Sequence, residues 1–231
     1  KCLFLAYDQG LEHGSEDFND KNVDPNYIIE IARKGRYNGI IFQKGIAEKY
    51  KKEIKASKIP LIVKLNGKTN LVKGEPVSRQ LCSVDEAVKL GAVAVGYTIY
   101  IGSKQESVMI SEFGKIKREA VKKGLPVILW AYPRGAGVKG KRSRELMAYA
   151  SRVGLEVGAD IVKIQYNGKM NDLKWAVKNS GKVKVVIAGG VKTGENELLK
   201  DVQEIIKVGG VGLAVGRNVW QSENPMEITK K

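Results

Sequence analysis

Residues 158–165 read Gly-Ala-Asp-Ile-Val-Lys-Ile-Gln, a glycine that can end a helix followed at once by a short apolar run. Glycine commonly closes helices, and near-continuous apolar runs are typical of strands covered on both faces. The same pattern recurs through the chain. With two further apolar runs it gives eight candidate strands: Leu3–Asp8, Gly39–Gln43, Pro60–Leu65, Ala92–Tyr97, Pro126–Ala131, Asp160–Gln165, Val183–Ala188 and Val211–Val215.

Between these runs lie segments with apolar residues at helical spacing, for example 27–32, 146–157 and 198–206. Strands that alternate with helices through short connections form βαβ units. Eight such units without a break in composition favour a closed barrel over an open doubly wound sheet, and no G-x-G-x-x-G follows the first strand. The sequence therefore predicts an α/β protein, a single (β/α)8 (TIM) barrel over residues 1–231 with eight parallel strands. Because the last helix has barely begun at Asn224, we expect terminal segments of the natural protein to be missing.

The composition is that of a folded globular domain, with 43% apolar and 28% charged residues. A chain of 231 residues buries about 70% of its unfolded surface, so it needs no disulfide or metal to hold a core. Cys2 and Cys82 fit a reducing compartment. The sequence has no apolar run of membrane-spanning length and no signal-peptide pattern, so we expect a cytoplasmic protein without a membrane partner.

The formal net charge is +15. The basic residues are scattered along the chain rather than clustered, and no nucleic-acid-binding motif accompanies them, so we expect no nucleic-acid partner. A positive surplus would instead assist capture of an anionic small substrate. One histidine, His13, and two separated cysteines cannot supply the ligands of a typical catalytic zinc site, whereas a carboxylate-bound magnesium site is compatible with the composition.

Polar residues late in each apolar run are the candidate site residues, because active sites of (β/α)8 barrels lie at the carboxyl ends of the strands. These positions hold Asp8 and the following Glu12 and His13, then Lys64, Trp130, Tyr132, Arg134 and Lys163. Side chains alternate along a strand. Val162 and Ile164 suit the helix layer, which leaves Lys163 pointing into the barrel.

A lysine inside a mostly apolar barrel must be paired or must lose its proton, since burial disfavours the charged form. A neutral amine can attack a carbonyl and form a Schiff base, an electron sink for chemistry at the adjacent carbon–carbon bond. The alternative is a structural ion pair of Lys163 with Asp8 or Glu12. Lys64 is similarly placed, as a positive neighbour that lowers the pKa of the amine or as a phosphate contact.

Two glycine-bearing turns follow the last two candidate strands, at Gly189-Gly190 and at Gly216-Arg217. In barrels that bind phosphate esters, backbone N–H groups and a helix N-terminus at this place often face the anion. Arg217 would add a charge-assisted contact. The sequence therefore predicts a phosphorylated substrate.

Several stretches, in order along nearly the whole chain, resemble the archaeal-type class I fructose-bisphosphate aldolases, Schiff-base aldolases of the DeoC/DhnA type. They are Ala6–Gly14 (AYDQGLEHG), Lys64–Thr69 (KLNGKT), Gly96–Tyr100 (GYTIY), Tyr132–Gly135 (YPRG), Ala159–Lys163 (ADIVK) and Gly216–Gln221 (GRNVWQ). Gln9 stands where the family pattern has histidine, and Ala188 and Val191 where it has serine and proline. These departures affect the phosphate geometry rather than the imine chemistry.

The resemblance implies roles for individual residues. Lys163 would form the imine, Tyr132 would transfer protons, and Asp8 would complete the catalytic set. Gly189, Gly190, Gly216 and Arg217 would hold one phosphate and Arg134 would lie towards the other end of the sugar, with Trp130, Lys64 and His13 also in the pocket. The resemblance further implies a homo-oligomer, a decamer, that needs neither metal nor cofactor.

The implied reaction is the reversible cleavage of fructose 1,6-bisphosphate to dihydroxyacetone phosphate and glyceraldehyde 3-phosphate, a step of glycolysis and gluconeogenesis. Heptulosonate-forming transaldolases of early aromatic biosynthesis share the lysine and the tyrosine and are one alternative. Segments 66–70 and 97–100 resemble the aldolases more closely. A non-catalytic phosphate-binding barrel, with Lys163 only in an ion pair, is the other alternative.

Overall fold

The computed structural model describes residues 1–190 and 194–231. Its main sheet is a closed barrel with the strand order β1-β10-β9-β8-β7-β6-β3-β2, in which all neighbouring strands are parallel. The barrel strands are β1 (Cys2–Ala6), β2 (Gly39–Gln43), β3 (Leu61–Lys64), β6 (Ala92–Ile101), β7 (Val127–Pro133), β8 (Ile161–Ile164), β9 (Lys184–Ala188) and β10 (Gly212–Val215).

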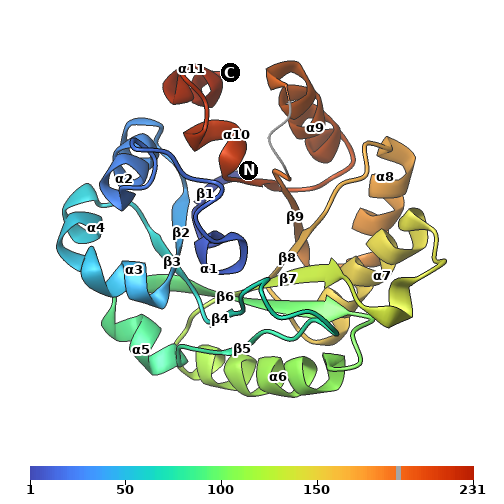
Figure 1. Cartoon of the computed structure of the whole chain (residues 1–231). Coiled ribbons are helices and arrows are strands. Elements are labelled where there is room, and N and C mark those ends of the chain that lie inside the picture. Colours follow the sequence, from blue (N-terminus) through green and yellow to red (C-terminus); the bar gives the residue numbers. More distant parts are fainter. Residues whose placement is uncertain (191–193) are drawn as a thin grey trace.

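Most of the helices form a ring around these strands, whereas the short α1 lies inside that ring (Figure 1). The helices are α1 (Gly10–His13), α2 (Pro25–Lys34), α3 (Lys44–Lys49), α4 (Lys51–Ser57), α5 (Val84–Lys89), α6 (Glu106–Lys122), α7 (Ser143–Glu156), α8 (Met170–Asn179), α9 (Glu195–Lys207), α10 (Arg217–Trp220) and α11 (Pro225–Lys230). None of the helices in the described ranges is long and apolar enough to cross a membrane.

The predicted (β/α)8 barrel is confirmed, because every predicted strand is present and β1 pairs with both β10 and β2 to close the sheet. Most strand ends differ from the predicted ones by one or two residues; β1, for example, ends at Ala6 rather than at Asp8. Two differences lengthen strands at their carboxyl ends. Strand β6 runs on to Ile101 and β7 to Pro133, beyond the predicted ends. The two strands pair along this extension, with Tyr100 opposite Tyr132. The added length carries polar side chains up to the rim of the barrel.

The barrel separates two apolar clusters. The interior cluster is small and includes Ile128, Trp130 and Ala214, whereas the larger cluster between sheet and helices includes Val162 and Ile164. Lys163 is therefore directed into the barrel, as the alternation in β8 predicts. A Cβ on Gly96 would lie 2.2 Å from a ring carbon of Trp130, so glycine at this place makes room for the indole inside the barrel.

A small antiparallel hairpin, β4 (Asn66–Gly67) with β5 (Arg79–Gln80), lies on the barrel rim and was not predicted from the sequence. Asn66 anchors it. Its buried amide donates to the carbonyl oxygens of Ser78 and Thr98, and its Oδ1 accepts from the Thr98 N–H. Since Thr98 belongs to β6, the hairpin is held over the carboxyl ends of the strands.

Candidate active site

One pocket at the carboxyl ends of the strands contains every candidate site residue from the sequence. Its lining includes Asp8, His13, Lys64, Trp130, Tyr132, Arg134, Lys163, Gly189, Gly190, Gly216 and Arg217. The barrel closure brings residues that are more than two hundred positions apart in the chain to one place, because parallel strands end at the same side.

Lys163 lies at the bottom of this pocket and is only 5% exposed. Strand pairing places it opposite Trp130, and its Nζ is 4.9 Å from the centroid of the indole ring. Burial is the main reason that the pKa of its amine is lowered to about 8; the charge of Asp8 opposes this shift, and the charge of Lys64 contributes to it. A substantial fraction of the amine is therefore neutral near physiological pH.

The carboxylates that could have paired with Lys163 have other partners. Asp8 Oδ2 lies 3.6 Å from Lys64 Nζ. Glu12 Oε1 lies 2.6 Å from a guanidinium nitrogen of Arg134. Within residues 1–190 and 194–231, Lys163 makes no ion pair, so the geometry favours the nucleophilic amine over the structural ion pair.

Tyr132 follows Trp130 on the same face of β7; Trp130 belongs to the interior cluster, and the partly buried Tyr132 packs against it. Burial, with a contribution from the negative charge of Asp8, raises the pKa of its phenol well above the usual value. The hydroxyl, which an ordinary tyrosine also keeps protonated at neutral pH, can donate a proton or a hydrogen bond, and the raised pKa makes the phenolate harder to form. Strand pairing brings it to the same end of the barrel as Lys163.

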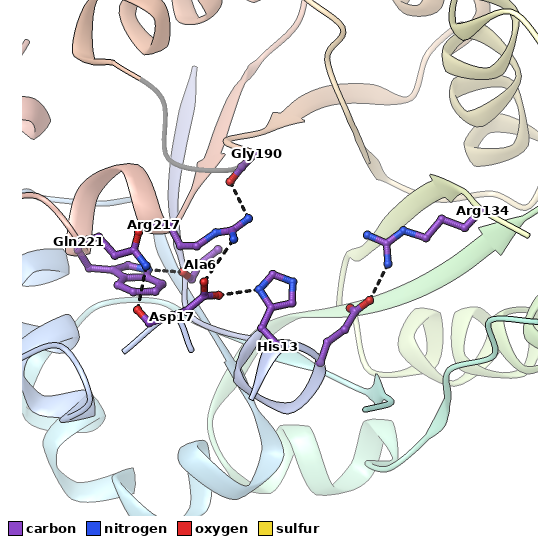
Figure 2. Close-up of polar contacts among 9 residues, drawn as sticks. Ala6, His13, Asp17, Arg134, Gly190, Arg217 and Gln221 are labelled. Atoms are coloured by element: carbon purple, nitrogen blue, oxygen red, sulfur yellow. Dashed lines mark hydrogen bonds and ion pairs between the residues drawn. The ribbon is translucent and has the colours of Figure 1, made fainter. Parts of the chain in front are cut away.

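At one end of the pocket, Arg134 is held by Glu12 (Figure 2). Its guanidinium carbon lies 5.3 Å from the centroid of the Tyr100 ring and 5.7 Å from that of Tyr132. The Tyr100 hydroxyl donates to Glu12 at 3.1 Å. A cation is thus fixed above the two aromatic rings.

At the other end, Arg217 donates to the carbonyl oxygen of Gly190 at 3.2 Å and to Asp17 at 3.3 Å (Figure 2). The N–H of Gly189 donates to Ala214, so it serves the barrel rather than an anion. A Cβ on Gly216 would come 2.8 Å from the carbonyl oxygen of Ala6, which explains the glycine in this turn. The departure from the family pattern at Val191 lies outside the described residues.

Several residues that line or support the pocket have no role assigned from the sequence, among them Tyr100 and Asp17. Glu12, a candidate site residue and a possible partner for Lys163, instead binds Arg134. Tyr100 lies on the part of β6 that extends past the predicted strand end. Asp17 contacts His13 and Arg217 from behind the pocket lining. A longer alternating pattern in β6 was the available signal for Tyr100, but pairings such as Asp17–Arg217 leave no signal in one sequence.

Comparisons with known proteins agree with this geometry. A family model described as DeoC/LacD family aldolase matches residues 2–222. The fructose-bisphosphate aldolase class 1 of Thermoproteus tenax is 50% identical over 233 residues, which cover 100% of this chain and 87% of the relative. That of Halobacterium salinarum is 44% identical over 227 residues, covering 97% and 86%.

A solved structure of an archaeal fructose-1,6-bisphosphate aldolase, with its catalytic Lys covalently bound to the carbinolamine intermediate of the substrate, is also similar. It is 50% identical and has a TM-score of 0.95, and the match covers 100% of this chain and 91% of that one.

Proposed function

Because this chain belongs to the DeoC/LacD family of aldolases, we propose that it is a class I, Schiff-base fructose-bisphosphate aldolase. It reversibly cleaves fructose 1,6-bisphosphate to dihydroxyacetone phosphate and glyceraldehyde 3-phosphate, a reaction of glycolysis and gluconeogenesis. The observation that carries the proposal is the buried amine of Lys163, with a pKa lowered to about 8 and no carboxylate partner in the described part of the chain.

Lys163 is the nucleophile in this proposal. Its neutral amine adds to the C2 carbonyl of the open-chain sugar to give a carbinolamine, which loses water to form a protonated imine. The imine accepts the electron pair of the C3–C4 bond as that bond breaks. The C4 hydroxyl gives up its proton, and glyceraldehyde 3-phosphate leaves as the aldehyde. Protonation at C3 and hydrolysis of the imine then release dihydroxyacetone phosphate and restore the amine.

Tyr132 is the proposed acid and base for these proton transfers. Its phenol is protonated at neutral pH, as tyrosines ordinarily are, and burial raises its pKa further, so it starts as a donor. Asp8 is the proposed third member of the catalytic set. Its carboxylate pairs with Lys64, and it also offsets part of the burial penalty on Lys163.

The two ends of the pocket suit the two phosphates of the substrate. Arg217, with the turns at Gly189-Gly190 and Gly216, is the proposed contact for the phosphate of the dihydroxyacetone part. Arg134 is the proposed contact for the other phosphate. Trp130, against which the amines of Lys64 and Lys163 lie, forms part of the pocket wall. His13 is a further proposed substrate contact, and Lys64 is the proposed positive neighbour that helps to lower the pKa of Lys163.

The test of the activity is direct. Purified protein is incubated with fructose 1,6-bisphosphate, and both triose phosphates are measured. Equal amounts of the two products support the aldolase. Release of glyceraldehyde 3-phosphate only when another aldehyde acceptor is present, with the dihydroxyacetone phosphate unit joined to that acceptor rather than released, would instead indicate a transaldolase, and no turnover with any acceptor would indicate a phosphate-binding barrel.

We also propose that the chain acts as a cytoplasmic homo-oligomer, a decamer in the family to which its motifs are similar. Two large aromatic side chains support an interface, since Tyr149 on α7 and Trp175 on α8 are 60% and 41% exposed. The helices α7 and α8 are neighbours in the helix ring (Figure 1). Light scattering coupled to gel filtration gives the mass directly, and a monomer would contradict the proposal.

A further inference from the structure

Asp17 lies between the imidazole of His13 and the guanidinium of Arg217, two side chains of the pocket. Its Oδ2 accepts a hydrogen bond from His13 Nδ1 at 2.6 Å, and its Oδ1 lies 3.3 Å from a guanidinium nitrogen of Arg217. Figure 2 shows the imidazole and the guanidinium meeting at this carboxylate. His13 and Arg217 line the pocket, whereas Asp17 is not among the lining residues in the part of the chain that the structure describes.

The backbone around Asp17 is fixed by contacts with the other end of the chain. The Gln221 side chain donates to the Asp17 carbonyl oxygen at 2.8 Å. The next residue, Phe18, packs against Tyr7 and Trp220, with ring centroids 5.3 and 5.9 Å away. Trp220 in turn donates its indole N–H to the Ala6 carbonyl oxygen of β1. The backbone at Asp17 is therefore held in place by residues from both the N-terminal and the C-terminal part of the chain.

We propose that Asp17 is a positioning residue that directs His13 and Arg217 together at the phosphate of the dihydroxyacetone part of the substrate. This inference rests on the proposed aldolase function. It makes His13 a second phosphate contact beside Arg217, and it gives the carboxylate a role although it touches no substrate.

The geometry supports a positioning role in two ways. Arg217 donates to two acceptors on different segments, Asp17 and the Gly190 carbonyl oxygen, so its planar guanidinium has one preferred orientation. The imidazole of His13 is bound to Asp17 through Nδ1. In its imidazolium form both ring nitrogens are donors, so Nδ1 donates to Asp17 and Nε2 can donate to the phosphate. Side chains that are already oriented lose less conformational entropy when the ligand binds.

The positioning role and simple electrostatics predict opposite signs. Asp17 carries a negative charge near a site for an anion, so its removal should strengthen phosphate binding if only charge matters. If Asp17 holds the two donors in place, its removal should weaken phosphate binding. The sign of the change therefore separates the two roles.

The experiment compares Asp17→Asn with the wild-type protein in the condensation direction, using glyceraldehyde 3-phosphate and two ketone donors. For dihydroxyacetone phosphate we expect KM to rise about tenfold, the usual effect of losing one well-placed charge-assisted contact. For unphosphorylated dihydroxyacetone the KM should stay within about twofold, since the lost contact serves the phosphate. Asp20→Asn, which removes the same charge from an exposed position of the same segment, is the matched control and should match the wild type.

A double-mutant cycle adds a result that a merely structural role would not give. If Asp17 acts through Arg217, Asp17→Asn should add little to the loss already caused by Arg217→Ala. Additive effects, a lower or unchanged KM for dihydroxyacetone phosphate, or equal losses with both ketones would overturn the inference.

If Asp17→Asn does not fold, the same measurements are made on His13→Gln, because this variant leaves the Asp17–Arg217 pair in place. It should raise the KM for the phosphorylated ketone alone, and no rise would overturn the role of His13. Inactivity of the wild-type protein with both ketones would contradict the proposed function itself.

Discussion

Replacing Lys64 by methionine removes a positive charge beside the proposed nucleophile. The Nζ atoms of Lys64 and Lys163 lie 5.1 and 4.9 Å from the centroid of the same Trp130 ring, so they are at most about 10 Å apart. Lys64 lowers the pKa of the Lys163 amine. It also pairs with Asp8 at 3.6 Å, and the variant would free this carboxylate to stabilise the charged form of Lys163. Both effects raise the pKa of Lys163.

The size of the shift follows from Coulomb's law. At about 10 Å and an effective dielectric constant of about 20, two unit charges interact by about 1.7 kcal/mol, or about 1.2 pKa units. The nucleophile is the neutral amine, which predominates above its pKa. Lys64→Met should therefore move the rise of kcat/KM with pH about one unit higher than its wild-type position near 8. Activity should be about tenfold lower at pH 7 and nearly restored at pH 10.

The assay is the pH dependence of kcat/KM for cleavage of fructose 1,6-bisphosphate. Lys52→Met removes the same charge from an exposed turn of α4 and serves as the control. The alternative role for Lys64 is a direct contact with a phosphate of the substrate. In that case the variant would lose affinity for phosphorylated substrates equally at every pH, and an unshifted profile would refute the electrostatic role.

Other variants and treatments test the remaining assignments. Lys163→Met should abolish turnover and keep the fold, because it replaces a costly buried amine by an apolar side chain of similar length; loss of the cooperative thermal transition would favour a structural role. Tyr132→Phe should lower kcat by roughly 10² to 10⁴ with dihydroxyacetone phosphate still bound, and a drop of less than about tenfold would make it a packing residue. Arg217→Ala should lower the affinity for phosphorylated substrates by about 10- to 150-fold and the affinity for dihydroxyacetone much less. Equal losses for both would show that Arg217 does not contact the phosphate. Activity should survive exhaustive dialysis against a chelator because the electron sink is the protonated imine, and a loss restored by metal would contradict the class I mechanism.

The barrel could be predicted because its signal is repeated and local. Six of the eight strands are short apolar runs after a glycine, and the alternation in β8 was enough to predict that Lys163 points into the barrel. The hairpin of β4 and β5 has strands of two residues each, too short for any periodic pattern, and depends on Asn66 contacts with a distant strand. Its position on the rim is therefore a tertiary feature.

The site was predictable as a set of residues but not as a set of contacts. Their place at the carboxyl ends of strands, together with the family motifs, brought the candidates to one pocket. The partner of each charge depends on side-chain geometry across the barrel. Asp8 pairs with Lys64 rather than Lys163, and Glu12 with Arg134, which lies 122 positions away in sequence.

The imine on Lys163 is tested most directly by mass spectrometry after borohydride reduction in the presence of dihydroxyacetone phosphate. Borohydride reduces the imine to a stable secondary amine, so the peptide that contains residue 163 should carry the mass of the reduced adduct as activity is lost. Without the ketone, or in Lys163→Met, the adduct should be absent. An adduct on Lys64, or loss of activity without any adduct, would contradict the assignment of the nucleophile.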